Sequence, residues 1–292
     1  MRPSVLRLYP ADYRCTHGDE IAEVYGETVR DAPASVRYRE TLDIAGHALR
    51  LRLGLGSAGR PAELVATAAP FALAASAAWS AAYITGWYVG ARAGAQQPVF
   101  HLHPQLTALM ACHLVVLVGA VTALASRWLP GVLLTAAGLT LLTGTSLAVG
   151  PVHADPVGLT AVMAALTAVI VLGCPPDLRP APSTRALAGA AAAVAWLPLA
   201  ALYAHLLPIT TDYGAWPFLV LAATGAGTAL AARSSGLLHL AAMALAAAPF
   251  VALSASVWGS ALPVLAGWAL IPLAAVPTYA LHLLRGGRTP AL

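Results

Sequence analysis

The fold of this chain is decided by residues 104–149, PQLTALMACHLVVLVGAVTALASRWLPGVLLTAAGLTLLTGTSLAV. The stretch contains two long apolar segments, 104–125 and 128–149, and its one charged side chain, Arg127, lies between them. About 20 apolar residues at 1.5 Å per residue cross a hydrocarbon core of roughly 30 Å, and a helix satisfies its own backbone hydrogen bonds there. The sequence therefore predicts a hairpin of two membrane spans.

The same pattern continues on both sides of this hairpin, from about Leu64 to Leu284. The predicted spans are residues 64–90, 104–125, 128–149, 156–173, 185–208, 215–232, 236–258 and 261–284. The chain is 59% hydrophobic and 10% charged, with a mean hydropathy of +0.74, whereas about a quarter of the residues in soluble domains are charged. We predict an all-α fold, a polytopic membrane bundle of about eight transmembrane helices.

Charge divides the chain into two parts. Residues 1–60 contain nine Arg and eight of the 12 acidic residues, so we predict a cytoplasmic helical head over 1–60 and a transmembrane domain over 61–292. The start of the chain lacks a signal-peptide pattern. With the head inside, only Arg92 falls outside, and the other six arginines between and after the spans fall inside: Arg127, Arg179, Arg185, Arg233, Arg285 and Arg288. This predicts a multi-pass protein of the plasma (inner) membrane with both termini cytoplasmic, and lipid rather than nucleic acid as its surroundings.

The head is predicted to form two helices. The first covers about 18–31, with Thr16 near its start, and the second begins near Ser35 and ends before Gly54. On the second helix, one side carries Tyr38, Leu42, Ala45, Leu49 and Leu53, and Arg37, Arg39, Arg50 and Arg52 lie elsewhere. These arginines are candidates for contact with a protein partner or the membrane surface. The alternative is a helix that packs on its neighbour with solvated arginines.

A short pattern in the head carries a resemblance. The residues Tyr9-Pro10, Arg14, His17-Gly18 and Glu20 follow the form YP-x3-R-x2-[YH]-G-x-E. This resembles the N-terminal segment of uncharacterised actinobacterial multi-pass integral membrane proteins, and a similar segment precedes the first span of some MacB-like permeases. The resemblance implies a cytoplasmic helical module on a membrane anchor. It implies no catalytic residue.

Within the predicted spans, ionisable side chains are scarce. The deepest is His113, beside Cys112. An intramembrane histidine can pass a proton or bind a metal, or it can simply hydrogen-bond a neighbouring helix. Both interpretations of this possible intramembrane polar site remain open from the sequence.

Histidine and aspartate residues gather in the predicted outer loops. The candidate metal ligands are His101, His103, His153 and Asp155, with His205 and Asp212 in the next outer loop. Imidazole and carboxylate are ligands of Zn, Cu and Fe, but a site requires that the loops converge; otherwise these are solvated loop residues. No cofactor is predicted, because the phosphate-loop, dinucleotide, hydrolase and aspartate-rich motifs are all missing from the sequence.

These observations support three hypotheses and favour a non-enzymatic role. The first is a regulatory or permease-like membrane component that acts through its cytoplasmic helical head. The second is a small-molecule transporter for a neutral or amphiphilic substrate, suggested by proline-containing spans rich in small residues. The third is a membrane enzyme or metal-binding protein that uses the outer His and Asp set.

Overall fold

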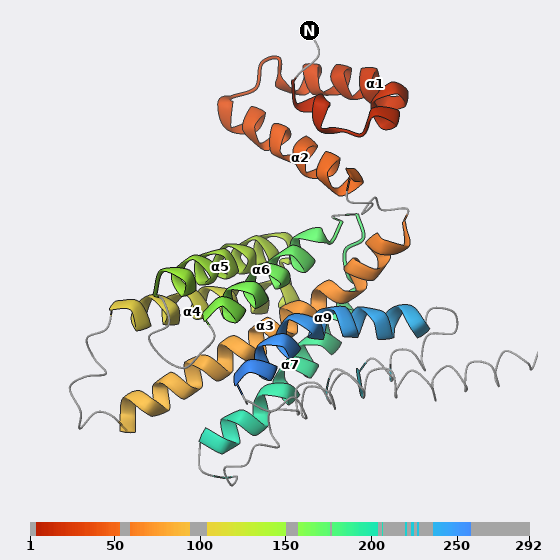
Figure 1. Ribbon diagram of the computed structural model, residues 1–292. Coiled ribbons are helices and arrows are strands. Elements are labelled where there is room, and N and C mark those ends of the chain that lie inside the picture. Colours follow the sequence, from red (N-terminus) through yellow and green to blue (C-terminus); the bar gives the residue numbers. More distant parts are fainter. Residues whose placement is uncertain are drawn as a thin grey trace, which may run out of the picture. The chain divides into compact units, whose positions relative to one another are not determined.

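The computed structural model describes residues 4–52, 59–93, 104–149, 157–175, 177–203 and 236–257, with residues 206, 220, 223, 224 and 227 in addition. These residues form eight α-helices and one 3₁₀-helix and contain no strand (Figure 1), which confirms the predicted all-α class for this part of the chain. The chain divides into two compact units, Met1–Glu63 and Leu64–Leu292. A division of function at residue 60 stays a prediction.

The first unit is a helical hairpin with a short helix on its open end. It consists of η1 (Ser4–Leu8), α1 (Ala11–Val29) and α2 (Ala34–Arg52). Leu6, Tyr9 and Ala48 form its buried core, and half-buried side chains of α1 and α2 pack around them. Pro33 lies between the two helices, where its missing N–H costs no helical hydrogen bond.

The first helix of the head begins earlier than predicted. The sequence placed its start near Gly18, whereas α1 begins at Ala11, directly after Pro10. Pro10 has an extended ψ of 149° and so sets the chain direction from which the helix starts. Thr16, predicted near the start, instead lies inside α1, and its hydroxyl donates to the carbonyl of Asp12 over 3.1 Å. A threonine that bonds one turn back fits a helix interior as well as a helix start.

The second unit contains the apolar helices. They are α3 (Arg60–Ala93, of which residues from Leu64 on belong to this unit), α4 (Pro104–Ala125), α5 (Trp128–Val149), α6 (Val157–Gly173), α7 (Pro182–Tyr203) and α9 (Gly236–Val257). Four of them, α3, α4, α5 and α7, are long and apolar enough to cross a membrane. The chain is therefore a multi-pass membrane protein. The predicted spans 215–232 and 261–284 lie almost entirely outside the described residues.

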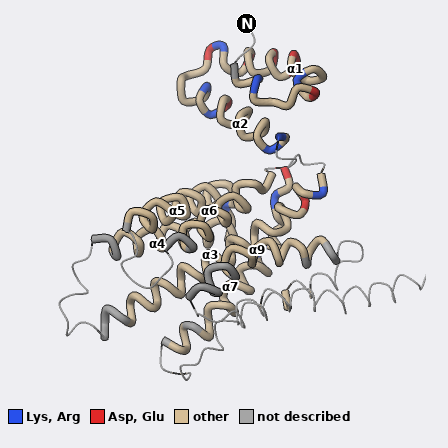
Figure 2. The backbone as a smooth tube through the Cα atoms, in the orientation of Figure 1, with Lys and Arg blue, Asp and Glu red and all other residues tan. Residues whose placement is uncertain are grey.

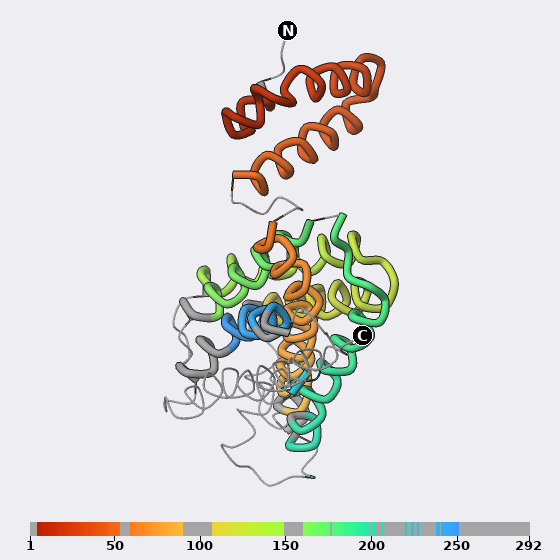
Figure 3. The backbone as a smooth tube through the Cα atoms, turned by 90° about the vertical axis from the view of Figure 1, so that its right-hand side faces the viewer, coloured from red at the N-terminus to blue at the C-terminus, as the bar shows by residue number. Residues whose placement is uncertain are grey.

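Helix α3 is the centre of this unit. Its spanning segment is 61% buried, against 18–44% for the other three long helices. The buried run from Ala68 to Ala77, with Phe71 and Leu73, belongs to one hydrophobic cluster that also includes side chains of α4, α5, α6, α7 and α9. Pro70 lies inside this run. Helices α4, α5 and α6 lie side by side (Figures 1 and 3).

Glycines bring α4 and α5 into close contact. A Cβ atom added at Gly119 of α4 would lie 2.5 Å from the backbone nitrogen of Thr135, and one at Gly138 of α5 would lie 2.8 Å from Val116. At Gly131 an added Cβ would collide with the backbone of Ala123. Small residues allow this approach between helix backbones, which stabilises helix pairs in lipid. The turn between the two helices is only Ser126 and Arg127.

Candidate functional site

Charged residues of the described chain are concentrated on α1, α2 and the first turn of α3, and the apolar helices carry few, as the coloured backbone of Figure 2 shows. The head is therefore the part of this chain with the most polar chemistry. Its geometry decides whether the predicted contact residues are free to meet a partner.

An aromatic cluster closes the hairpin of the head. Tyr9 is buried, with only 3% of its surface exposed. Its hydroxyl lies 2.9 Å from Nδ1 of His47 on α2. The ring of Tyr13 stacks on Tyr9 with a centroid distance of 5.2 Å, and His17 lies against Tyr13 at 4.8 Å. Three of the four side chains come from the segment between residues 9 and 17, so this segment contributes one of the contacts that join η1 and α1 to α2.

The hydroxyl of Tyr9 is kept neutral by its surroundings. Burial raises the pKa of Tyr9 above its ordinary value of 10.0, the nearby Tyr13 and Asp43 raise it further, and Arg50 lowers it. Tyr9 therefore acts as a neutral hydrogen-bonding group in the core of the head.

Two of the four predicted contact arginines bond inside the head. Arg37 donates from Nε to the carbonyl of Ala32 over 2.8 Å, which closes the turn before α2. Arg52 donates to the carbonyls of Leu8 and Arg7 at the end of η1. Arg39 is exposed and Arg50 is half-buried. Contact with a partner stays a prediction for all four, and Arg39 is the one that projects most freely.

The apolar side of α2 predicted from the sequence is not the side that packs on α1. The packed side carries Ile44, Ala48 and Leu51. The other apolar side is what we call the α2 stripe: Tyr38, Leu42, Ala45 and Leu49. Its three large side chains are 67%, 53% and 58% exposed, respectively. At 100° per residue, Arg39 and Arg50 border one edge of the stripe and Arg52 the other.

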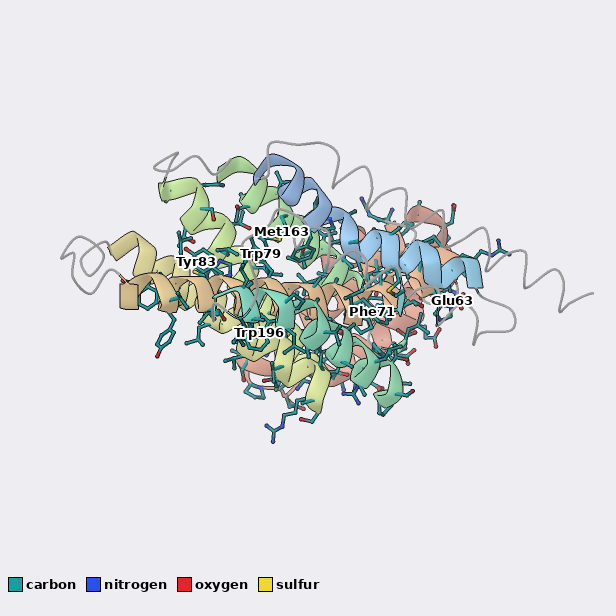
Figure 4. All side chains as sticks on the ribbon, turned by 90° about the horizontal axis from the view of Figure 1, so that it is seen from below. Glu63, Phe71, Trp79, Tyr83, Met163 and Trp196 are labelled. Atoms are coloured by element: carbon teal, nitrogen blue, oxygen red, sulfur yellow. The ribbon has the colours of Figure 1, made fainter. Side chains whose placement is uncertain are left out.

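The described part of the second unit has one buried histidine, His113 of α4, which is 2% exposed. Its Nδ1 lies 3.2 Å from the hydroxyl of Ser80 on α3, and the ring of Tyr83 stacks on it at 4.0 Å. Figure 4 shows Tyr83 on α3. Three other buried hydroxyls bond carbonyls of their own helices: Ser76 to Leu73, Thr135 to Gly131 and Thr167 to Met163. His113 thus has a partner on a neighbouring helix, as one of the two sequence interpretations requires.

The bond between Ser80 and His113 gives a testable prediction. In the bilayer interior such bonds contribute about 0.6 kcal/mol on average and up to about 1.7. We expect Ser80→Ala and His113→Leu to be non-additive, with a coupling energy of about 1 kcal/mol in detergent unfolding. As a control, Ser76→Ala combined with His113→Leu should be additive, because the Ser76 hydroxyl bonds its own helix. Additivity in the Ser80 pair would show that the bond contributes nothing.

The predicted metal ligands are not placed. His101, His103, His153 and Asp155 lie outside the described residues, as do His205 and Asp212. Among the residues that are described, no three His, Cys, Asp or Glu side chains gather in a way that could hold a metal ion. The outer set stays a prediction.

Comparisons of the chain with protein families, with curated proteins and with solved structures found no match. The resemblance of the head to actinobacterial multi-pass proteins and permeases therefore stays a prediction. The function of the chain has to be argued from its own residues.

Sequence reasoning missed several residues that the fold brings together. His47 was not connected with Tyr9, because 38 positions separate them. Ser80 and Tyr83 were not recognised as neighbours of His113, although their spacing of three residues places them on one side of a helix. That spacing was the available signal, but serine and tyrosine are too common in spans to identify a partner without the fold.

Proposed function

We propose that this protein is a non-enzymatic membrane component, regulatory or permease-like, that acts through its N-terminal helical head. The observation that carries the proposal is the exposed α2 stripe. The head builds its core from a different side of α2, so Tyr38, Leu42 and Leu49 are not needed to hold the hairpin together. Large exposed side chains in a row along one helix are typical of interaction surfaces.

A protein partner fits the stripe better than the membrane surface. Nine Arg and eight acidic residues leave residues 1–60 with a net charge of only about +1, whereas anionic membranes attract clusters of four to eight basic residues. The outer side of α1 carries exposed acidic residues, Asp12, Asp19, Glu20, Glu23 and Glu27, which an anionic surface would repel. Tyrosine and arginine are enriched among the residues that dominate protein interfaces. We infer a partner with an apolar groove bordered by carboxylates that face Arg39.

The location of the head completes the proposal. We infer an inner-membrane protein with both termini in the cytoplasm. The arginines around the predicted spans support this orientation, since six of seven after residue 60 fall on the side of the head.

In-cell crosslinking tests the role of the stripe. We expect a photoreactive phenylalanine derivative at position 38 of the full chain to give one discrete protein adduct, and the same group at position 23 to give none. Leu42→Asp should lower the adduct yield about 30-fold, as loss of a central interface residue does, while Leu42→Met should retain it. Deleting residues 1–60 should abolish any phenotype that depends on the protein.

Two outcomes would contradict the proposal. Adducts with lipid alone would assign the stripe to the membrane surface, and equal adducts from positions 38 and 23 would show no specific surface. Hydrogen exchange of α1 and α2 in the Leu42→Asp protein serves as the control for folding of the head, because Leu42 is exposed and its loss should leave the hairpin intact.

A further inference from the structure

A groove lies between α3, α4 and α7. Its volume is about 510 Å³, within the range of about 300 to 1,000 Å³ that small-molecule sites occupy. Its walls are apolar and include Ala77 and Ala81 of α3, Leu117 and Val121 of α4, and Gly189 and Trp196 of α7. Figure 4 shows Trp196 on α7 beside α3. An alkyl chain would bury its surface against these walls.

The groove contains one charged group, Arg185 of α7. One of its terminal nitrogens donates to the carbonyl of Ser126 over 3.2 Å and to that of Ala123 over 3.5 Å, at the C-terminal end of α4. These carbonyls hold the guanidinium in place. Its Nε is buried and has no hydrogen-bond partner among the described residues. A buried donor on a cation without an acceptor is unfavourable, and an anionic group in the groove would offset the positive charge of the guanidinium.

Along α7, Arg185 lies near one end of the groove and Trp196 lies at the other. Positions 185, 189, 192, 193 and 196 recur on one side of the helix. Eleven residues at 1.5 Å each separate Arg185 from Trp196 by about 16 Å along the axis. This is the length of an extended chain of about a dozen methylene groups. The site thus combines a cationic end with an apolar channel of acyl-chain length.

We propose that this groove binds an anionic phospholipid of the surrounding membrane, with the phosphate at Arg185 and an acyl chain along α7 toward Trp196. Charge complementarity selects an anionic headgroup over a zwitterionic or neutral one. The surrounding membrane is the source of the ligand, because α7 is the least buried of the four long helices. Only 18% of its spanning segment is buried, and it exposes Leu187, Val194 and Leu197. The proposal is independent of the role of the head.

Fluorescence of Trp196 reports on the site. The full chain is placed in phosphatidylcholine nanodiscs that contain increasing fractions of phosphatidylglycerol brominated on its acyl chains, or of brominated phosphatidylcholine. The Trp196 signal is the difference between the wild type and Trp196→Phe. We expect half-maximal quenching at a roughly tenfold lower fraction of the anionic lipid, the effect of one charge-assisted hydrogen bond.

Two pairs of variants separate the contributions of charge and space. Arg185→Gln should remove the preference for the anionic lipid, whereas Arg127→Gln, an exposed arginine in the α4–α5 turn, should keep it. A Cβ added at Gly189 meets no neighbouring part of the protein within 4 Å, so Gly189→Leu places its side chain in open space of the groove and should abolish quenching by either lipid. Gly144→Leu, at an equally open position on α5, should leave quenching unchanged.

Three results would overturn the proposal. Equal quenching by both lipids in the wild type would show that the quenching comes from the surrounding bilayer and not from a specifically bound lipid. Quenching that persists in Gly189→Leu would place the lipid elsewhere. A folded wild-type protein that shows no Trp196 quenching at all would show that another part of the chain occupies the groove.

Discussion

Replacing Gly131 with leucine is expected to prevent α4 and α5 from packing and to destabilise the membrane domain by more than about 3 kcal/mol. Even the first added carbon would collide with the backbone nitrogen and Cα of Ala123, and a helix backbone cannot move aside as a flexible side chain can. The Ser126–Arg127 turn leaves little slack between the helices. We therefore expect Gly131→Ala to be destabilising as well, by a smaller amount.

The measurement is the midpoint of unfolding in detergent, together with the fraction of monodisperse protein. Gly144→Leu is the matched control, because Gly144 lies on the same helix with open space around it. A Gly131→Leu protein with the midpoint of the wild type would mean that α4 and α5 do not approach as closely as the fold requires.

Replacing Tyr9 with alanine is expected to open the hairpin of the head. The change removes a buried ring, its stacking on Tyr13 and its bond to His47. Loss of a buried aromatic side chain costs about 3 to 5 kcal/mol, which corresponds to a fall of roughly two to four orders of magnitude in amide protection. Hydrogen exchange of α1 and α2 in the full chain measures this fall.

A second tyrosine of the same head provides the control. Tyr38 is 67% exposed, so Tyr38→Ala should change the stability of the hairpin by less than about 0.5 kcal/mol. Similar losses of protection in the two variants would contradict the assignment of Tyr9 to the core.

The same residue predicts a dependence on pH. Because the pKa of Tyr9 in the folded head lies above its ordinary value of 10.0, neutral Tyr9 contributes its full stability below pH 10. This contribution is lost as the pH rises above 10 through the folded-state pKa. A spin label on the exposed Cys15 of α1 should report the loss of order in the head as the pH rises. In Tyr9→Phe, which lacks the hydroxyl, we expect this loss of order to occur at a higher pH.

The sequence predicted the boundaries of several membrane spans well, because these boundaries depend only on the local sequence. The predicted spans 104–125 and 128–149 coincide with α4 and α5, and 236–258 with α9 to within one residue. A long apolar run ends where polar residues begin, and this boundary needs no knowledge of the neighbours. The start of α1 was misplaced because Thr16 and Pro10 both fit a helix start, and propensity alone did not choose between them.

The candidate sites were less predictable. The α2 stripe was identified as an apolar side from spacing alone, but only the packing of Ile44, Ala48 and Leu51 on the other side leaves it exposed. Arg52 looked free in the sequence and instead bonds η1, more than 40 residues away. Arg185 was assigned only to membrane orientation, although it also lines the groove beside α7.

By itself, then, the amino-acid sequence determined that this chain is an all-α, multi-pass membrane protein with a polar N-terminal head, since transfer of apolar segments into lipid depends on composition and length. Tertiary structure decided which side of each helix is covered, what bonds His113, and where Arg185 meets a groove. The physical reason is that lipid tails and helix surfaces are almost equally apolar. Hydropathy therefore cannot distinguish the side of a span that faces lipid from the side that faces another helix. Close packing at small residues such as Gly131 determines which side faces the neighbouring helix.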